Sequence, residues 1–178
     1  ICDTDIVVGK IARLFELKGH DDLLSVAPEL VRACPQMKFL LVGDGAWRGR
    51  LEARARDMGL GDQFIFAGLV PPDAVPPLMG IMDIVVHLSR REGLARALPQ
   101  ALAAAKPIVA YDCDGANEVC VDDETGFLVK PGDLSALSQC LIRLAASKNL
   151  RESLGRRGQA FVTDHFSVAK MVDAQHSL

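Results

Sequence analysis

Short apolar segments alternate with longer amphipathic segments along most of the chain. Six of the short segments are rich in β-branched residues and nearly free of polar ones, as strands buried on both faces of a sheet should be. These predicted strands cover 6–8, 39–42, 64–66, 84–86, 108–110 and 127–129. Segments with helical periodicity lie between and after them, at 21–33, 47–58, 73–79, 95–105, 116–121, 133–147, 150–163 and 167–175.

This alternation predicts an α/β fold. Strands joined through helices by right-handed crossovers run parallel, so we expect a doubly wound, Rossmann-like parallel sheet of about six strands with helices on both faces. Pro and Gly mark the segment boundaries, as at Pro131-Gly132, and Asp133 is suited to cap the helix that follows. No repeat or internal linker interrupts the pattern, so residues 1–178 are expected to form a single domain.

Composition and charge narrow the classes of function. With 178 residues the chain can bury a substantial core, and 49% hydrophobic with 24% charged residues is ordinary for a globular protein. A net charge of −3 and only 5% aromatic residues argue against a nucleic-acid partner. No apolar run approaches the roughly 20 residues that a membrane-spanning helix needs, and we find no signal peptide.

The cysteines predict where the protein is located, and the first residue bears on the extent of the chain. Five cysteines are odd in number, widely scattered and without a C-x-x-C pair, so we interpret them as free thiols of a cytoplasmic protein. The chain begins at Ile1 rather than at a methionine, and a strand-like segment follows almost at once. We therefore expect it to be a piece of a longer protein.

In an open parallel sheet, function is expected in the loops beyond the carboxyl ends of the strands. The loop after the first strand carries Arg13 and Lys18, five residues apart, and leads into a helix. Two cations beside a helix N-terminus suit a diphosphate, because the helix end adds free N–H groups and partial positive charge. The alternative is a pair of solvated surface cations.

Two further loops offer ambiguous signals. Gly43, Gly45 and Gly49 follow the second strand in a spacing that only loosely matches a dinucleotide-binding motif, and we interpret them as a tight turn with close backbone approach. Asp112 and Asp114 form a D-x-D after the fifth strand. Such a pair could hold a divalent metal, but we favour turn residues that hydrogen bond to the nearby backbone.

The loop after the fourth strand begins "REGLARALPQ" and places Glu92 just before an apolar helix that carries Gln100. The two side chains are eight residues apart, so they could contact opposite ends of one elongated ligand. The alternative is a capping acid and an amide that faces solvent.

Together, six segments resemble one known family. In order they are "GKIARLFELKGHDDLL", "FLLVGDGAWRGRLE", "IFAGLVP", "DIVVHLSRREGL", "ALAAAKPIVAYDCDGANEV" and "DETGFLVKPGDLSAL". They span about residues 6–140 in the order and spacing of the donor-binding, C-terminal half of the retaining GT-B glycosyltransferases of the group 1 family. The resemblance implies a GT-B half with a nucleotide-sugar site.

The resemblance assigns roles to matching positions. Arg13 and Lys18 match the pair that neutralises the donor diphosphate, and Glu92 matches the first acid of an E-x7-E motif, which contacts the transferred sugar. Gly93 and Leu94 match backbone positions close to the phosphates. Arg13, Lys18 and Glu92 are therefore the residues expected to take part in catalysis.

Other positions match the nucleoside end of the family's site. Phe66, Ala67 and Gly68, with Leu69 and Val70 after them, belong to a turn that lines the nucleobase, and Glu118 matches an acid at a helix start that is expected to be structural. Gln100 stands where the second acid of E-x7-E would hold the ribose hydroxyls. An amide can still form those hydrogen bonds, at a loss of about 1 kcal/mol for the missing charge assistance.

Two more positions depart from the family's pattern. Ala105 stands where a glycine is usual at a helix end, and Ala95 stands where proline is common. Both departures bear more on donor affinity than on the fold.

The implied function is transfer of a hexose-type sugar, with retention, from a UDP-, GDP- or ADP-sugar to a glycan, lipid or small-molecule acceptor. The fixed cations stabilise the leaving diphosphate, so no metal or other cofactor is expected to be required. The acceptor is expected to bind to an N-terminal domain that is absent from this chain. This chain by itself is expected to bind nucleotide weakly and to transfer no sugar. We expect a cytoplasmic protein, peripheral at most to the inner membrane face.

Three alternatives stay open. The first is another enzyme on the same fold, a sugar-nucleotide epimerase or a glycosyl phosphorylase, although no convincing pyridoxal-phosphate lysine is visible. The second is a non-catalytic Rossmann-like module with a decayed donor site, of which Gln100 would be the sign. The third is a metal-dependent transferase built on Asp112 and Asp114.

Overall fold

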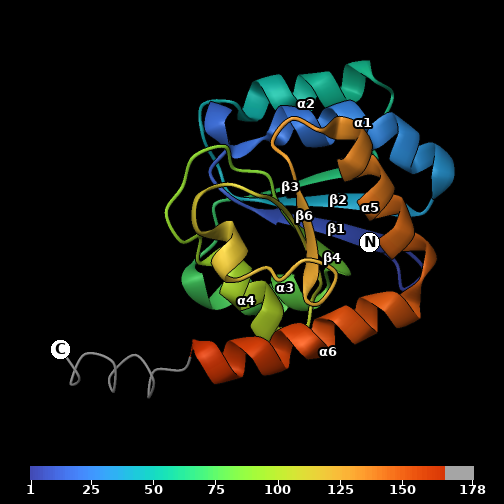
Figure 1. Ribbon diagram of the computed structural model, residues 1–178. Helices are drawn as coiled ribbons and strands as arrows, with labels where there is room; N and C mark the ends of the chain where they lie inside the picture. The colour runs from blue at the N-terminus through green and yellow to red at the C-terminus, as the bar shows by residue number, and fades with distance from the viewer. Residues whose placement is uncertain (167–178) are drawn as a thin grey trace.

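The computed structural model describes residues 1–166 and contains one parallel six-stranded sheet between two layers of helices (Figure 1). All six predicted strands are present, and the α/β prediction is confirmed. The strands are β1 (Ile6–Ile11), β2 (Met37–Val42), β3 (Phe64–Gly68), β4 (Ile84–His87), β5 (Ile108–Tyr111) and β6 (Gly126–Val129). Their order is β3-β2-β1-β4-β5-β6, so the direction of winding reverses between β1 and β4.

In residues 1–166, six α-helices connect or follow the strands. They are α1 (His20–Ala33), α2 (Arg48–Asp57), α3 (Val75–Gly80), α4 (Ala97–Ala103), α5 (Leu134–Ala146) and α6 (Lys148–His165). Three 3₁₀ turns accompany them at Glu16–Lys18, Pro72–Ala74 and Asp114–Glu118. The helix predicted at 167–175 lies outside the described residues.

Two helix predictions need correction. The segment 116–121 is not an α-helix, because Asp114–Glu118 forms a 3₁₀ turn whose backbone bonds, such as Ala116 N–H to the Cys113 carbonyl at 3.2 Å, close three-residue turns. The segment 73–79 divides into a 3₁₀ turn and α3. The predicted cap at Asp133 is confirmed, since its carboxylate accepts the Ala136 N–H at 2.9 Å.

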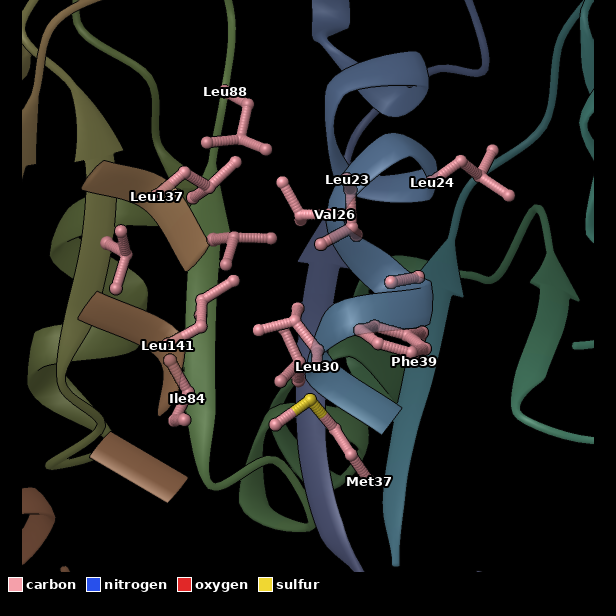
Figure 2. Close-up of a cluster of buried hydrophobic side chains, with 14 of the residues drawn as sticks. Leu23, Leu24, Val26, Leu30, Met37, Phe39, Ile84, Leu88, Leu137 and Leu141 are labelled. Atoms are coloured by element: carbon pink, nitrogen blue, oxygen red, sulfur yellow. The ribbon is translucent and has the colours of Figure 1, made fainter. Parts of the chain in front are cut away.

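The sheet has a separate apolar core on each face. Leucines of α1 and α5 pack against one face, and Figure 2 shows Leu23 and Leu30 of α1 and Leu137 and Leu141 of α5 above the strands. The other face is covered by α3, α4 and α6, as Figure 1 shows. Side chains alternate along each strand, so Val8 joins the first core and its neighbour packs into the second. Burial on both faces explains the unbroken apolar strand segments.

The end of α4 shows how one unusual residue is accommodated. The Ala105 N–H bonds to the Leu102 carbonyl and the Lys106 N–H to the Ala101 carbonyl, both at 2.9 Å, which is a Schellman motif. This motif holds Ala105 at φ +54°, a left-handed conformation that costs an alanine about 1 kcal/mol. Gly155 of α6 packs on this turn, where an added Cβ would lie 2.0 Å from the Ala105 carbonyl oxygen.

Two global properties complete the description. All five cysteines are free thiols in the structure. Among residues 1–166, no helix combines the length and the apolar character needed to cross a bilayer.

Candidate functional site

A cavity of about 390 Å³ opens at the carboxyl edge of the sheet, beside the point where the strand order reverses between β1 and β4. Its lining includes Arg13, Lys18, Glu92 and Gln100, four residues predicted from separate loops and a helix. The volume suits a small-molecule ligand. The position agrees with the rule that open α/β sheets bind ligands where the winding reverses.

An ion pair joins the two loops that form the cavity. The Lys18 Nζ lies 2.7 Å from the Glu92 Oε2, although the residues are 74 positions apart in the sequence. Burial acts to raise the Glu92 pKa, but the hydrogen bond and the charge of Lys18 hold that pKa below its usual value. Glu92 is therefore an ionised acceptor with one cation already fixed beside it.

The backbone around Arg13 is held by the loop that follows β2. A Cβ on Gly43 would lie 2.1 Å from the Ala12 carbonyl oxygen, and one on Gly45 would lie 2.4 Å from the Leu14 carbonyl oxygen. Both glycines have positive φ, and the Leu14 N–H donates to the carbonyl of the intervening aspartate at 3.0 Å. The interpretation as a tight turn with close backbone approach is confirmed for Gly43 and Gly45, but not for Gly49, where an added Cβ would meet nothing within 4 Å.

His20, the first residue of α1, fixes the Arg13 backbone from the other side. Its Nε2–H donates to the Arg13 carbonyl at 3.0 Å, and the ring is almost completely buried. Burial, reinforced by the charge of Lys10, lowers the His20 pKa to about 4. The Arg13 side chain itself is exposed and lines the cavity, and its guanidinium makes no ion pair within residues 1–166.

The D-x-D motif supports the loop after β4. The Asp114 carboxylate accepts the backbone N–H of Glu92, and the Asp112 carboxylate accepts from the Asn117 amide at 3.4 Å. The expected bonds to the nearby turn backbone are therefore replaced by one across two loops and one to a side chain. Within residues 1–166, no group of three His, Cys, Asp or Glu side chains is arranged to hold a metal ion.

Asp22 clamps the same loop to α1. Its Oδ2 accepts from the Arg90 guanidinium and from the Tyr111 hydroxyl, both at 2.8 Å. The Arg90 N–H also donates to the Leu17 carbonyl at 2.8 Å, next to Lys18. These bonds fix the relative position of the loops that carry the ion pair.

Two buried polar residues at this edge were not predicted. Lys10 near the end of β1 is 1% exposed, and burial together with the charge of Lys18 lowers its pKa to about 7. His87 ends β4 and lines the cavity, with its Nε2 3.5 Å from the Glu92 Oε2. Burial, followed by the charge of Lys10, lowers the His87 pKa to about 4, so this ring is neutral near pH 7. The signal in the sequence that could have revealed them was a lysine and a histidine, each at the end of an apolar run.

Several predicted residues lie outside the cavity lining. Phe66 lines a different hollow beside α2, and the Gly68 carbonyl accepts the Gly43 N–H at 2.8 Å. Ala67 is exposed but does not line the cavity; of the predicted turn, Val70 lines it, together with Pro72 and Val75.

The residues expected near the phosphates and at the helix start take different positions. Gly93 and Leu94 are exposed next to Glu92 on the rim, but neither is among the residues that line the cavity. Glu118 is exposed at the end of the 3₁₀ turn after β5.

Comparison with known proteins identifies a family that matches most of the chain. Residues 1–161 match the family described as "Glycosyl transferases group 1". The chain is 29% identical over 162 residues to the 2-deoxystreptamine glucosyltransferase of Streptomyces kanamyceticus, covering 91% of this chain and 42% of that protein. The chain thus spans less than half the length of this curated relative.

Solved structures agree on the fold. The structure of Anabaena HepE in complex with UDP-glucose superposes with a TM-score of 0.86 and 26% identity, over 98% of this chain and 50% of that one. The C-terminal domain of the group 1 family protein LpcC from Francisella tularensis gives a TM-score of 0.85 and 25% identity, over 92% of this chain and 87% of that one. The fold is that of the GT-B glycosyltransferases.

Proposed function

The chain belongs to the group 1 glycosyl transferases, and from this premise we propose that it is the donor-binding domain of a retaining hexosyltransferase. The observation that carries the proposal is the meeting of Arg13, Lys18, Glu92 and Gln100 in one cavity. Cations, a carboxylate and an amide are the groups that a nucleoside diphosphate sugar requires. The complex of HepE with UDP-glucose supports this ligand class.

The cations act on the leaving group. When the bond between the sugar and the diphosphate breaks, negative charge grows on the phosphate oxygens, and fixed guanidinium and ammonium groups lower the barrier. Arg13 provides a free guanidinium on a rigid backbone, and Lys18 is held in place by Glu92. In this proposal the chain's own cations perform the task that a metal performs elsewhere.

The remaining walls take the sugar and the nucleoside. Glu92 accepts hydrogen bonds from hydroxyl groups of the transferred sugar, because its carboxylate stays ionised beside Lys18. Gln100 bonds to the ribose, for which an amide offers both a donor and an acceptor. The apolar segment with Val70 and Val75 lines the nucleobase, so Val70 is the residue of the predicted turn that takes part.

The acceptor is proposed to bind elsewhere in the full-length enzyme. The near-complete match to a domain described as C-terminal in LpcC supports an additional N-terminal domain. A glycan, lipid or small-molecule acceptor would meet the donor from that side. We expect this chain alone to bind nucleotide and to transfer no sugar.

Calorimetry tests the proposal. UDP, GDP and ADP are titrated into the chain with and without manganese, beside an Arg13→Ala/Lys18→Ala variant and a matched Lys148→Ala/Arg156→Ala variant. The control pair lies on α6, is largely exposed and is not among the residues that line the cavity. Binding of one nucleotide without metal, lost only in the first variant, is the expected result.

Other outcomes would select an alternative. Binding that requires manganese would favour the metal-dependent enzyme built on Asp112 and Asp114. No binding of any nucleotide, with the fold intact by circular dichroism, would favour a module whose donor site has decayed.

A further inference from the structure

Arg96 and Gln100 stand one helical turn apart at the start of α4, and both line the cavity. The Gln100 N–H donates to the Arg96 carbonyl at 3.2 Å, which places the two residues in the helical i,i+4 relation. Side chains in this relation on a helix surface are neighbours. The amide that departs from the family pattern therefore has a cation beside it.

The charges of the cavity are not balanced by the protein. Its fully charged lining groups are Arg13, Lys18, Arg96 and Glu92, and Lys18 is already paired with Glu92. Within residues 1–166, neither Arg13 nor Arg96 takes part in an ion pair. Two free guanidinium groups thus face a hollow that suits a doubly anionic ligand.

We propose that Arg96 is a further ligand of the donor's diphosphate, and that Gln100 is the residue that leaves Arg96 free for it. This inference rests on the proposed function. A glutamate at position 100 would pair with Arg96 across one helical turn and would remove one of the two free positive charges. An amide keeps the hydrogen bonds to ribose hydroxyls and does not compete for the guanidinium.

Arg96 offers a second explanation for the amide at position 100, besides loss of the donor site. If the amide marks a decayed site, then Gln100→Glu should restore the missing acid and strengthen nucleotide binding. If the amide belongs with Arg96, the same substitution should weaken binding. The two accounts predict opposite signs for one substitution, and both residues are exposed, so their variants are expected to fold.

The test is a double-mutant cycle on the chain by calorimetry, with whichever of UDP, GDP and ADP binds the wild type. We expect Arg96→Gln to weaken binding about tenfold and Gln100→Glu about threefold or more. In the Arg96→Gln background, Gln100→Glu should no longer weaken binding, because the cation that it would capture is gone. Arg91→Gln is the matched control, an exposed arginine on the adjacent loop that does not line the cavity.

Comparison with the nucleoside monophosphate shows which part of the donor Arg96 contacts. Arg96→Gln should weaken binding of the nucleoside diphosphate more than binding of the corresponding monophosphate. Equal losses would place Arg96 at the nucleoside end and would overturn the assignment to the diphosphate.

The failures of the two proposals can be separated. Stronger binding by Gln100→Glu, or unchanged binding by Arg96→Gln in a chain whose binding still depends on Arg13 and Lys18, would overturn this inference alone. A wild-type chain that binds no nucleotide would overturn the proposed function and this inference together. Unfolding midpoints equal to that of the wild type verify that each variant is folded.

Discussion

The two edges of the sheet both carry charged side chains, but they use them differently. At the amino edge, Arg151 donates to the Leu144 and Ala145 carbonyls at 2.8 and 3.0 Å and pairs with Asp83 at 3.6 Å. Asp83 in turn accepts the Val7 N–H at 2.9 Å. A hollow of about 200 Å³ lies there too, yet these charged groups already have partners in the chain.

At the carboxyl edge, some charges are left open. Arg13 and Arg96 line the cavity without an ionic partner among the described residues, and Lys10 is buried beside it. The closed cluster at the amino edge joins helices and strands, whereas the open one is where we propose that a ligand binds. A charged cluster becomes informative about function when its groups lack partners within the protein.

Removing Arg151 should give the largest effect on stability. Arg151→Met removes the side-chain donor to the Ala145 carbonyl and one of the two donors to the Leu144 carbonyl, which keeps the Ser147 N–H at 3.3 Å. It also leaves the Asp83 carboxylate without its ion-pair partner, so the free energy of unfolding should fall by about 3–5 kcal/mol. Urea unfolding measures the loss. Nucleotide affinity of the folded variant should match the wild type, and a variant that loses affinity as well would contradict the separation of the two edges.

The second-largest effect on stability should come from acid, because the carboxyl edge of the sheet contains two buried histidines. Burial lowers the pKa of His20 and of His87 to about 4, so the unfolded chain binds more protons than the folded one between about pH 4 and 6.5. The contribution of each buried, neutral histidine to the free energy of unfolding is therefore fully present above about pH 6.5. It is lost as the pH falls, by roughly 3 kcal/mol per histidine at the acid end.

His20→Gln checks this pH dependence. The amide can still donate to the Arg13 carbonyl but does not titrate, so unfolding measured from pH 4 to 7 should show a shallower slope. His165→Gln changes an exposed histidine and should leave the slope as in the wild type. Equal slopes for all three chains would refute the assignment of the acid loss to buried His20.

Arg13→Ala should give the converse of Arg151→Met. Because the Arg13 side chain is exposed and makes no ion pair within residues 1–166, unfolding should change by less than about 0.5 kcal/mol. Nucleotide binding should weaken at least about tenfold, which corresponds to 1.4 kcal/mol. Calorimetry and urea unfolding on the same sample measure both; a stability loss without a binding loss would make Arg13 structural.

Ala105→Gly should give the smallest effect, and in the opposite direction. Glycine relieves the left-handed strain at the end of α4 but adds freedom to the unfolded chain, so we expect a gain of about 0.5 kcal/mol in the free energy of unfolding. Thermal unfolding measures it, and Ala103→Gly in the last turn of α4 should destabilise instead. A loss in Ala105→Gly would show that the strain is not released.

Local signals predicted more of the fold than of the site. The six strands could be located because each apolar run reports burial on both faces, and Asp133 could be assigned as a cap from its own position. Lys10 and His87 were missed because they end apolar runs, where a polar residue resembles the start of a loop. The partner of Asp114 was missed because it lies 22 residues away, in another loop.

By itself, the sequence determined the α/β class, the strands, the loops that carry charge and the family resemblance. Those properties depend on periodicity and on residue type, which are local. The tertiary structure decided which loops meet, since strand order brings the ends of β1 and β4 together. It also decided which charges are already paired, and so it separates Arg151 from Arg13 and Arg96. Pairing is a property of distance in space, which the spacing of residues along a chain does not contain.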